Sequence, residues 1–268
     1  IYNNINNNTC SGNAWTGISL ISSSRGNTLS GNDFSRNNNG VYLNHSDENV
    51  LVGNDCSNNA MYDGMYLQSS NRNIISENIC SHNSYNGIRL ASSNSNVVSD
   101  NSCLNNSADG ILLYASSYSV VSGNNCSSNS LLGIEVTGPS SDSNSIGDNI
   151  CLSNVIHGIQ FYMSNGSVVT ANVCMNNGYD GLYLYSSCNS TIGGNNCSSN
   201  FRYGIRLAIS SNGNSISMNR LGNNVRHGIN LLQVSGNRIW DNTFIGNNGA
   251  TDIYDISHIQ ANDSGSDN

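Results

Sequence analysis

The residues from Asn73 to Leu90 read NIISENICSHNSYNGIRL, and the same order of residue types returns ten more times along the 268-residue chain. With Cys80 as the origin of one copy, successive origins are separated by 22 to 25 residues. The eleven origins are Cys10, Phe34, Cys56, Cys80, Cys103, Cys126, Cys151, Cys174, Cys197, Leu221 and Phe244. A period of this length is typical of a solenoid in which each copy forms one turn.

Two asparagines occur in every copy, two residues before the origin and three residues after it, as Asn78 and Asn83 do around Cys80. Each copy also offers three short apolar pieces with alternating residues, none long enough for an amphipathic helix. Three strands per turn are therefore expected, with the asparagines at bends. There their amides can bond along the stack while their backbone adopts left-handed conformations.

Parallel pairing of successive turns at about 4.8 Å would stack equivalent residues into ladders. We therefore predict an all-β fold, a right-handed parallel β-helix of about eleven turns of 22 to 25 residues. The repeat resembles the PbH1 and NosD-like β-helix repeats of pectate-lyase-type enzymes, alginate epimerases and microbial surface proteins, including methanogen disaggregatase. The resemblance covers nearly the whole chain and implies a carbohydrate-active or cell-surface protein. Its matched positions are structural, so it leaves the activity open.

The repeat predicts a single domain over residues 1–261, a closing strand at Asp252 to Ile256 and a disordered tail over 262–268. The chain opens inside a turn without a capping helix, so we expect a fragment of a longer protein. Polarity and the family resemblance indicate an extracellular or cell-surface location. No apolar stretch is long enough for membrane insertion.

Charged residues make up only 10% of the chain, and the net charge is −8. All basic residues are arginines, and no basic stripe exists to neutralise phosphates, so nucleic acid is not an expected partner. Eight of the nine cysteines occupy the origin, where phenylalanine and leucine substitute for them, which predicts a stack of free, buried thiols. No metal site or cofactor is expected, and a calcium requirement and the oligomeric state stay open.

The residues that are neither Ser nor Asn gather on and beside the Gly-Ile-x-Leu strand, and we expect them to face outward as one strip. Aromatic faces stack on sugar rings, and arginines bind carboxylates or sulfates, so the strip predicts a polysaccharide partner. The expected substrate-binding residues are Tyr66, Arg89, Tyr114, Gln160, Tyr162, Tyr185, Tyr203 and His227.

Six residues are candidates for catalysis: Asp109, Glu135, His157, Asp180, Tyr183 and Arg206. Hydrolysis of a glycosidic bond would use two of the three carboxyl groups. Elimination or C5 epimerisation of a uronic acid would instead use a base, a proton donor and a cation. The sequence thus favours an extracellular enzyme, a lyase or glycoside hydrolase, acting on an acidic, uronate-containing glycan. The alternative is a non-catalytic carbohydrate-binding or spacer module of a surface protein.

Overall fold

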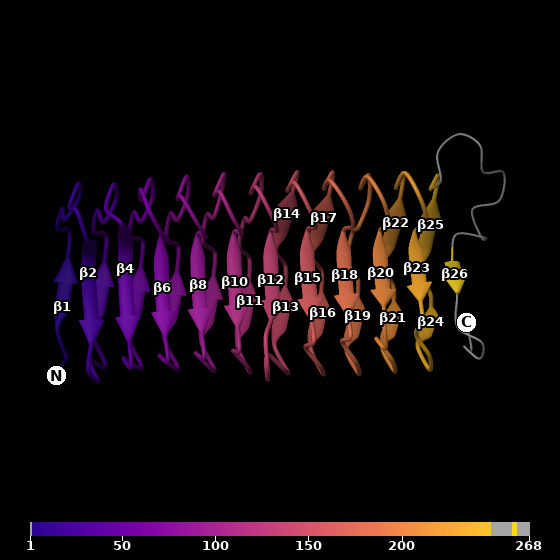
Figure 1. Cartoon of the computed structure of the whole chain (residues 1–268), viewed down its shortest axis with the longest axis horizontal. Coiled ribbons are helices and arrows are strands. Elements are labelled where there is room, and N and C mark those ends of the chain that lie inside the picture. The colour runs from indigo at the N-terminus through magenta and orange to yellow at the C-terminus, as the bar shows by residue number, and fades with distance from the viewer. Residues whose placement is uncertain (1, 248–258, 262–268) are drawn as a thin grey trace.

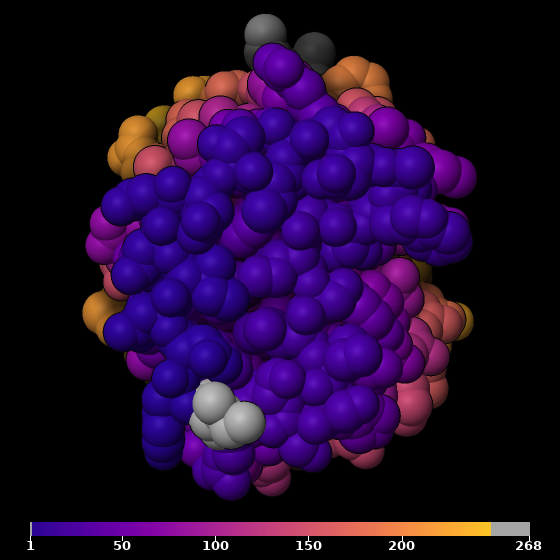
Figure 2. Space-filling view, turned by 90° about the vertical axis from the view of Figure 1, so that its left-hand side faces the viewer, coloured from indigo at the N-terminus to yellow at the C-terminus, as the bar shows by residue number. Residues whose placement is uncertain are grey.

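The computed structural model describes residues 2–247 and 259–261, and side chains over 2–247. The described residues form strands and no helix, and none of them belongs to a helix able to cross a bilayer. The turns follow one another along a single axis in sequence order (Figure 1). Seen from the end at which the chain begins, the first turns cover most of the later ones, so the turns are stacked with little lateral offset (Figure 2). The predicted parallel β-solenoid of about eleven turns is confirmed.

Eleven three-residue strands form the first parallel sheet, which begins each turn. They are β1 (Asn4–Asn6), β3 (Thr28–Ser30), β5 (Val50–Val52), β7 (Ile74–Ser76), β9 (Val97–Ser99), β11 (Val120–Ser122), β13 (Ser145–Gly147), β16 (Val168–Thr170), β19 (Thr191–Gly193), β21 (Ser215–Ser217) and β24 (Arg238–Trp240). Their central residue is apolar and points into the core, as Ile75 and Val98 do. The alternation of the pleat then turns the two flanking residues outward.

The second parallel sheet consists of the Gly-Ile-x-Leu strands. They are β2 (Thr16–Ile21), β4 (Asn39–Asn44), β6 (Met65–Gln68), β8 (Ile88–Ala91), β10 (Ile111–Tyr114), β12 (Ile134–Thr137), β15 (Ile159–Tyr162), β18 (Leu182–Tyr185), β20 (Ile205–Ala208), β23 (Ile229–Leu232) and β26 (Ile259–Ala261). β26 pairs with β23 and adds an eleventh strand. The closing strand predicted at Asp252 to Ile256 and the tail over 262–268 lie outside the described residues.

The third face of each turn is narrower than the three-strand prediction implies. It contains two short pairs, β14 (Ile150–Leu152) with β17 (Val173–Met175) and β22 (Arg220–Gly222) with β25 (Thr243–Ile245). The remaining turns contribute single-residue parallel bridges, such as Asp55 with Ile79. The reason is local, because left-handed residues such as Glu77 and His82 leave only a few extended residues between two bends.

The origin residues lie in the core, as predicted. Cys56, Cys80 and the five cysteines that follow at this position are fully buried and free, as are the side chains of Phe34 and Leu221. The glycine that follows each origin by about seven residues is required by close packing. A Cβ on Gly87 would lie 2.6 Å from the carbonyl oxygen of Gly110 and 2.9 Å from the Cβ of Cys103.

Both predicted asparagine ladders are present and run from turn to turn. The backbone N–H and the side-chain amide of Asn78 both donate to Oδ1 of Asn101, at 2.9 and 3.0 Å. The same amide also donates to the carbonyl oxygen of Leu51 at 2.9 Å. Each ladder asparagine thus satisfies buried backbone groups at a bend that would otherwise lack partners.

The left-handed backbone expected at the asparagines occurs one residue earlier. Glu77 (φ 58°) precedes Asn78, His82 (φ 58°) precedes Asn83, and Ser95 (φ 57°) precedes Asn96. The residue before each ladder asparagine reverses the chain, and the asparagine side chain then points into the stack. Each left-handed non-glycine residue is strained, so the ladder hydrogen bonds offset a recurring cost.

Candidate functional site

The outward side chains of the second sheet form a continuous row, called here the strand row. Adjacent members are register partners on neighbouring turns, for example Tyr66 with Arg89 and Glu135 with Gln160. The row consists of Ser19, Tyr42, Tyr66, Arg89, Leu112, Glu135, Gln160, Tyr183, Arg206 and Asn230. The members from Tyr42 to Arg206 are half-buried, so each presents part of its side chain to solvent. Five of the predicted site residues and the catalytic candidate Glu135 lie in this row.

A second row, the base row, lies immediately before the glycines. We expected it to face outward, and for most of its members this was wrong: Asp63, Asn86, Asp109, His157, Asp180 and Tyr203 are buried. Their side chains accept backbone N–H groups from the next turn, as Asp109 Oδ1 accepts from Leu132 at 3.0 Å. The predicted catalytic residues Asp109, His157 and Asp180 therefore lie beneath the surface. His227 is the half-buried member near the end of the row.

A third row, the shoulder row, lies one residue further back at the bend, and the sequence analysis did not single it out. Its backbone is continuous, since Tyr85 N–H donates to the carbonyl of Tyr62 and Arg202 N–H to that of Tyr179. Several of its side chains are exposed and aromatic, among them Trp15, Tyr62, Tyr85 and Tyr179. The sequence signal was a large residue five positions after the origin.

The acidic part of the strip is a pair of carboxyl groups on adjacent turns. Asp109 and Glu135 hydrogen-bond to each other, and Nε2 of Gln160 donates to Oε1 of Glu135 at 3.2 Å. Burial, and then the neighbouring Glu135 charge, raise the pKa of Asp109 to about 8. Burial also raises the pKa of Glu135. Two close carboxyls cannot both ionise cheaply, so the pair shares a proton at neutral pH.

His157 and Asp180 form a second buried pair. Nδ1 of His157 accepts the backbone N–H of Asp180 at 3.1 Å and lies 3.4 Å from Asp180 Oδ2. Burial, with Arg202 and Arg206 nearby, lowers the pKa of His157 to about 3, so the imidazole is neutral and this contact is not an ion pair. Because Nδ1 is an acceptor, the ring proton belongs on Nε2. In this state His157 is a donor and not a base.

Arginine and aromatic side chains converge around Tyr203. The guanidinium carbons of Arg202, Arg206 and Arg226 lie 5.4, 5.7 and 5.8 Å from its ring centroid. Arg206 also lies 5.1 Å from the Tyr183 ring. Three of the nine basic residues of an acidic chain thus gather on three successive turns. This cluster is a positively charged region of the strip.

The predicted sugar-contacting tyrosines occupy the outer edge of the second sheet. Tyr162 and Tyr185 stack with ring centroids 4.9 Å apart and planes 10° apart. Tyr114 is exposed, and Tyr183 meets Tyr185 edge to face at 6.3 Å. Tyr183 also lies 4.9 Å from the His157 ring, so it covers the buried histidine.

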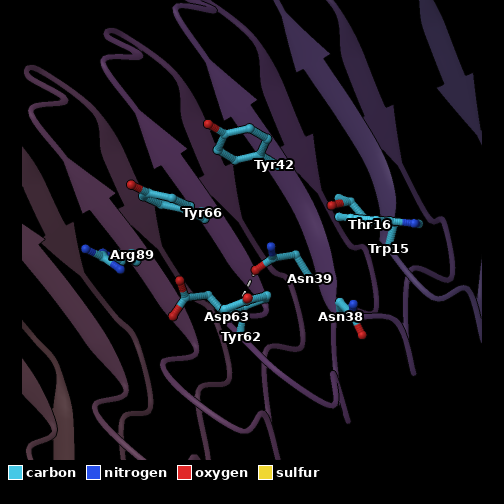
Figure 3. A pocket seen from close by; sticks show the side chains of 9 residues that line it. All are labelled: Trp15, Thr16, Asn38, Asn39, Tyr42, Tyr62, Asp63, Tyr66 and Arg89. Atoms are coloured by element: carbon cyan, nitrogen blue, oxygen red, sulfur yellow. Dashed lines mark hydrogen bonds between the residues drawn. The ribbon is translucent and has the colours of Figure 1, made fainter.

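The strip is most deeply hollowed in the first four turns, away from the predicted catalytic residues. A groove of about 440 Å³ lies there, lined by Trp15, Tyr42, Tyr62, Asp63, Tyr66 and Arg89 among others (Figure 3). Of these, Tyr66 and Arg89 were predicted site residues. The tilted rings of Tyr42 and Tyr66 have centroids 5.3 Å apart, and Arg89 lies over the Tyr66 ring at 4.8 Å.

Comparison with known families follows from this geometry. The family described as "Periplasmic copper-binding protein (NosD)" matches residues 1–62, 21–141 and 137–263. The chain belongs to the NosD family. No curated protein sequence matches this NosD-family chain.

Solved structures similar to this NosD-family protein include enzymes that act on polysaccharides. The A-module of Azotobacter vinelandii mannuronan C-5 epimerase AlgE6 superposes with a TM-score of 0.76 at 14% identity, covering 91% of this chain and 73% of the epimerase module. The Dettilon tailspike protein gives 0.76 at 16% identity, covering 97% and 60%. The periplasmic alginate epimerase AlgG gives 0.68 at 12% identity, covering 84% and 70%. At these identities the similarity establishes a shared fold.

Copper binding, named in the family description, does not fit the residues present in this NosD-family chain. Across residues 2–247, no three His, Cys, Asp or Glu side chains are grouped so that they could hold a metal ion. The one concentration of soft ligands is the cysteine stack, which is sealed inside the apolar core. We therefore derive no chemical step through copper.

Proposed function

We propose that this protein is an extracellular or cell-surface enzyme that binds an extended acidic polysaccharide along the strip and abstracts a proton from a uronate unit with Glu135. The observation that carries the proposal is the shared proton of Asp109 and Glu135, placed in a row of tyrosines and arginines. Glu135 is half-buried, whereas Asp109 and Asp180 are almost fully buried. Glu135 is therefore the carboxyl group of this cluster that a ligand can reach.

The raised pKa of Glu135 suits a general base, since proton abstraction is most efficient when the pKa of the base approaches the working pH. Glu135 would take the C5 proton, and the electron pair left behind would pass toward the uronate carboxylate. In a lyase the bond from C4 to the glycosidic oxygen then breaks, and that oxygen takes up a proton. In an epimerase a proton returns to the opposite face of C5.

The same pair argues against hydrolysis by two carboxyl groups. Retaining glycosidases hold their carboxyls about 5 Å apart, and inverting ones hold them further apart. Asp109 and Glu135 are instead in hydrogen-bond contact. A sugar oxygen or a water molecule has no room between them. The geometry thus favours a lyase or epimerase over a glycoside hydrolase.

The arginine cluster supports binding of an acidic polymer. Arg206 lies three turns from Glu135 in the strand row, or roughly 14 Å along the axis. At that distance it would hold an anionic group on a neighbouring sugar unit and not on the reacting one. Stacked Tyr162 and Tyr185 lie beside this path and offer aromatic faces to sugar rings.

A panel of acidic polysaccharides tests the proposal: alginate, polygalacturonate and chondroitin. Ultraviolet absorbance detects the unsaturated product of a lyase, and deuterium incorporation from heavy water detects an epimerase. New reducing ends without either signal would indicate hydrolysis and contradict the role given to Glu135.

A binding module without turnover is the second candidate. The burial of the base row favours it, because Asp109, His157 and Asp180 already accept backbone N–H groups. If acidic polysaccharides bind but none of the three reaction signals appears, this second function is the correct one.

A further inference from the structure

The groove in the first four turns is lined mainly by rings. Tyr42 and Tyr66 form one side on successive turns, with Arg89 next in line, while Asn39 and Asp63 lie opposite them and Trp15 stands toward the first turn (Figure 3). Trp15 is 81% exposed, an unusual state for an indole in a monomeric surface. An aromatic side chain held in the open beside a tyrosine pair provides a stacking surface for a flat, partly apolar ligand.

The polar groups of the groove are arranged differently from its rings. Asp63 lies buried at the floor, where its Oδ1 accepts the backbone N–H and the amide of Asn86 at 3.0 and 2.9 Å. Arg89 is the one basic residue lining the groove, and its buried Nε has no hydrogen-bond partner. The carboxylate of Asp63 is thus occupied by the protein, while a guanidinium donor remains available to a ligand.

We propose that this groove is a separate subsite that binds one anionic sugar unit of the polysaccharide, with its ring against Trp15 and Tyr66 and its acidic substituent on Arg89. A sugar ring has an apolar face for the aromatic side chains, and a carboxylate or sulfate group matches the planar fork of arginine. The proposal rests on the proposed function for the nature of the polymer.

The subsite lies at a distance from the catalytic pair. Tyr66 precedes Glu135 by three turns in the strand row, which is roughly 14 Å along the axis, and the Trp15 bend lies further still. A short oligosaccharide at Glu135 would not reach it. The subsite therefore makes affinity depend on chain length, because a longer chain gains a second anchoring point without a second binding event.

The two tryptophans of the chain allow a direct measurement. In a Trp240→Phe background, Trp15 is the sole tryptophan, and its fluorescence reports the groove alone. Titration with alginate, polygalacturonate and chondroitin oligosaccharides of increasing length should change this emission. Arg89→Ala should weaken the response about tenfold, the loss expected for one charge-assisted contact. Uncharged cello-oligosaccharides should bind at least about tenfold more weakly than the best acidic probe.

Tyr118→Ala is the matched control, since Tyr118 is 67% exposed and lies outside the groove. It should leave the titration unchanged, and thermal melts should show that every variant is folded. An emission that no acidic oligosaccharide alters, or an unchanged affinity in Arg89→Ala, would overturn the subsite. Turnover with a silent Trp15 would remove the subsite and keep the proposed enzyme. A Trp15 response without turnover would keep the subsite and remove the enzyme.

Discussion

The carboxyl groups of Asp109 and Glu135 hydrogen-bond to each other across adjacent turns, with Asp109 buried and Glu135 half-buried. The register of the second sheet produces this arrangement. Glu135 pairs with Leu112, three residues after Asp109 along the chain. The two acids thus share one site although 26 positions separate their numbers.

Replacing Glu135 with Gln should lower turnover of the acidic polysaccharide at least about 100-fold, the usual contribution of a general base. The amide keeps the shape and can still bond to Gln160, so binding should persist. Initial rates and a binding titration measure the two effects. Glu77→Gln, an exposed acid on a bend, is the control and should behave as wild type. Full activity in Glu135→Gln would remove the proposed base.

Asp109→Asn should alter the pH dependence of stability. The folded protein holds the Asp109 proton up to about pH 8, whereas the unfolded chain releases it near about pH 4. The raised pKa therefore gives stability that is present below about pH 4 and lost as the pH rises toward about 8. The variant should melt at a higher temperature than wild type at alkaline pH, and the difference should vanish in acid.

The comparison of variant with wild type isolates this carboxyl from His157, whose lowered pKa acts in the opposite direction below about pH 6.5. Asp148→Asn changes an exposed acid and serves as the control. Equal pH profiles for Asp109→Asn and wild type would show that the carboxyl pair shares no proton.

Asn124→Ala should destabilise the fold by about 2 to 4 kcal/mol, because it breaks several buried hydrogen bonds at once. Asn124 donates to the carbonyl of Val98 and to Oδ1 of Asn149, and it accepts from the backbone and amide of Asn101. Chemical denaturation measures the change. Ser130→Ala, an exposed hydroxyl on the same turn, should cost little. A similar cost for both would mean that the ladder adds nothing.

The cysteine stack predicts a pattern of thiol reactivity. Seven of the nine free cysteines are buried, while Cys10 and Cys188 are partly exposed. Burial also raises the pKa of thiols such as Cys80 and Cys126, which suppresses the reactive thiolate. In the native protein a thiol reagent should modify Cys10 and Cys188 alone, as mass spectrometry of peptides would show. Rapid native labelling of Cys126 would contradict the buried stack.

The fold could be predicted because its determinants repeat. Cys80, Asn78, Asn83 and Gly87 occupy positions whose residue types barely change between copies, and each has the same physical task on every turn. The narrow third face was not foreseen, because the left-handed conformations of Glu77 and His82 are not encoded by glycine.

The site was harder to predict than the fold. The strand row followed from alternation, but the burial of Asp109 and Asp180 did not, because a polar residue beside a glycine can equally face solvent. Those side chains turn along the stack to accept a backbone N–H, as asparagines do elsewhere. Trp15 and Tyr179 were overlooked because they lie at a bend, outside the alternating pattern of the strand.

Each ladder asparagine bonds only to the turns next to it, so one copy of the repeat can be added or removed without changing the contacts inside the others. Duplication of a single repeat would move Trp15 away from Glu135 by one fixed step of about 4.8 Å and leave both local environments intact. In such proteins the length of polymer that is recognised can therefore evolve in whole increments, independently of the chemistry performed on it.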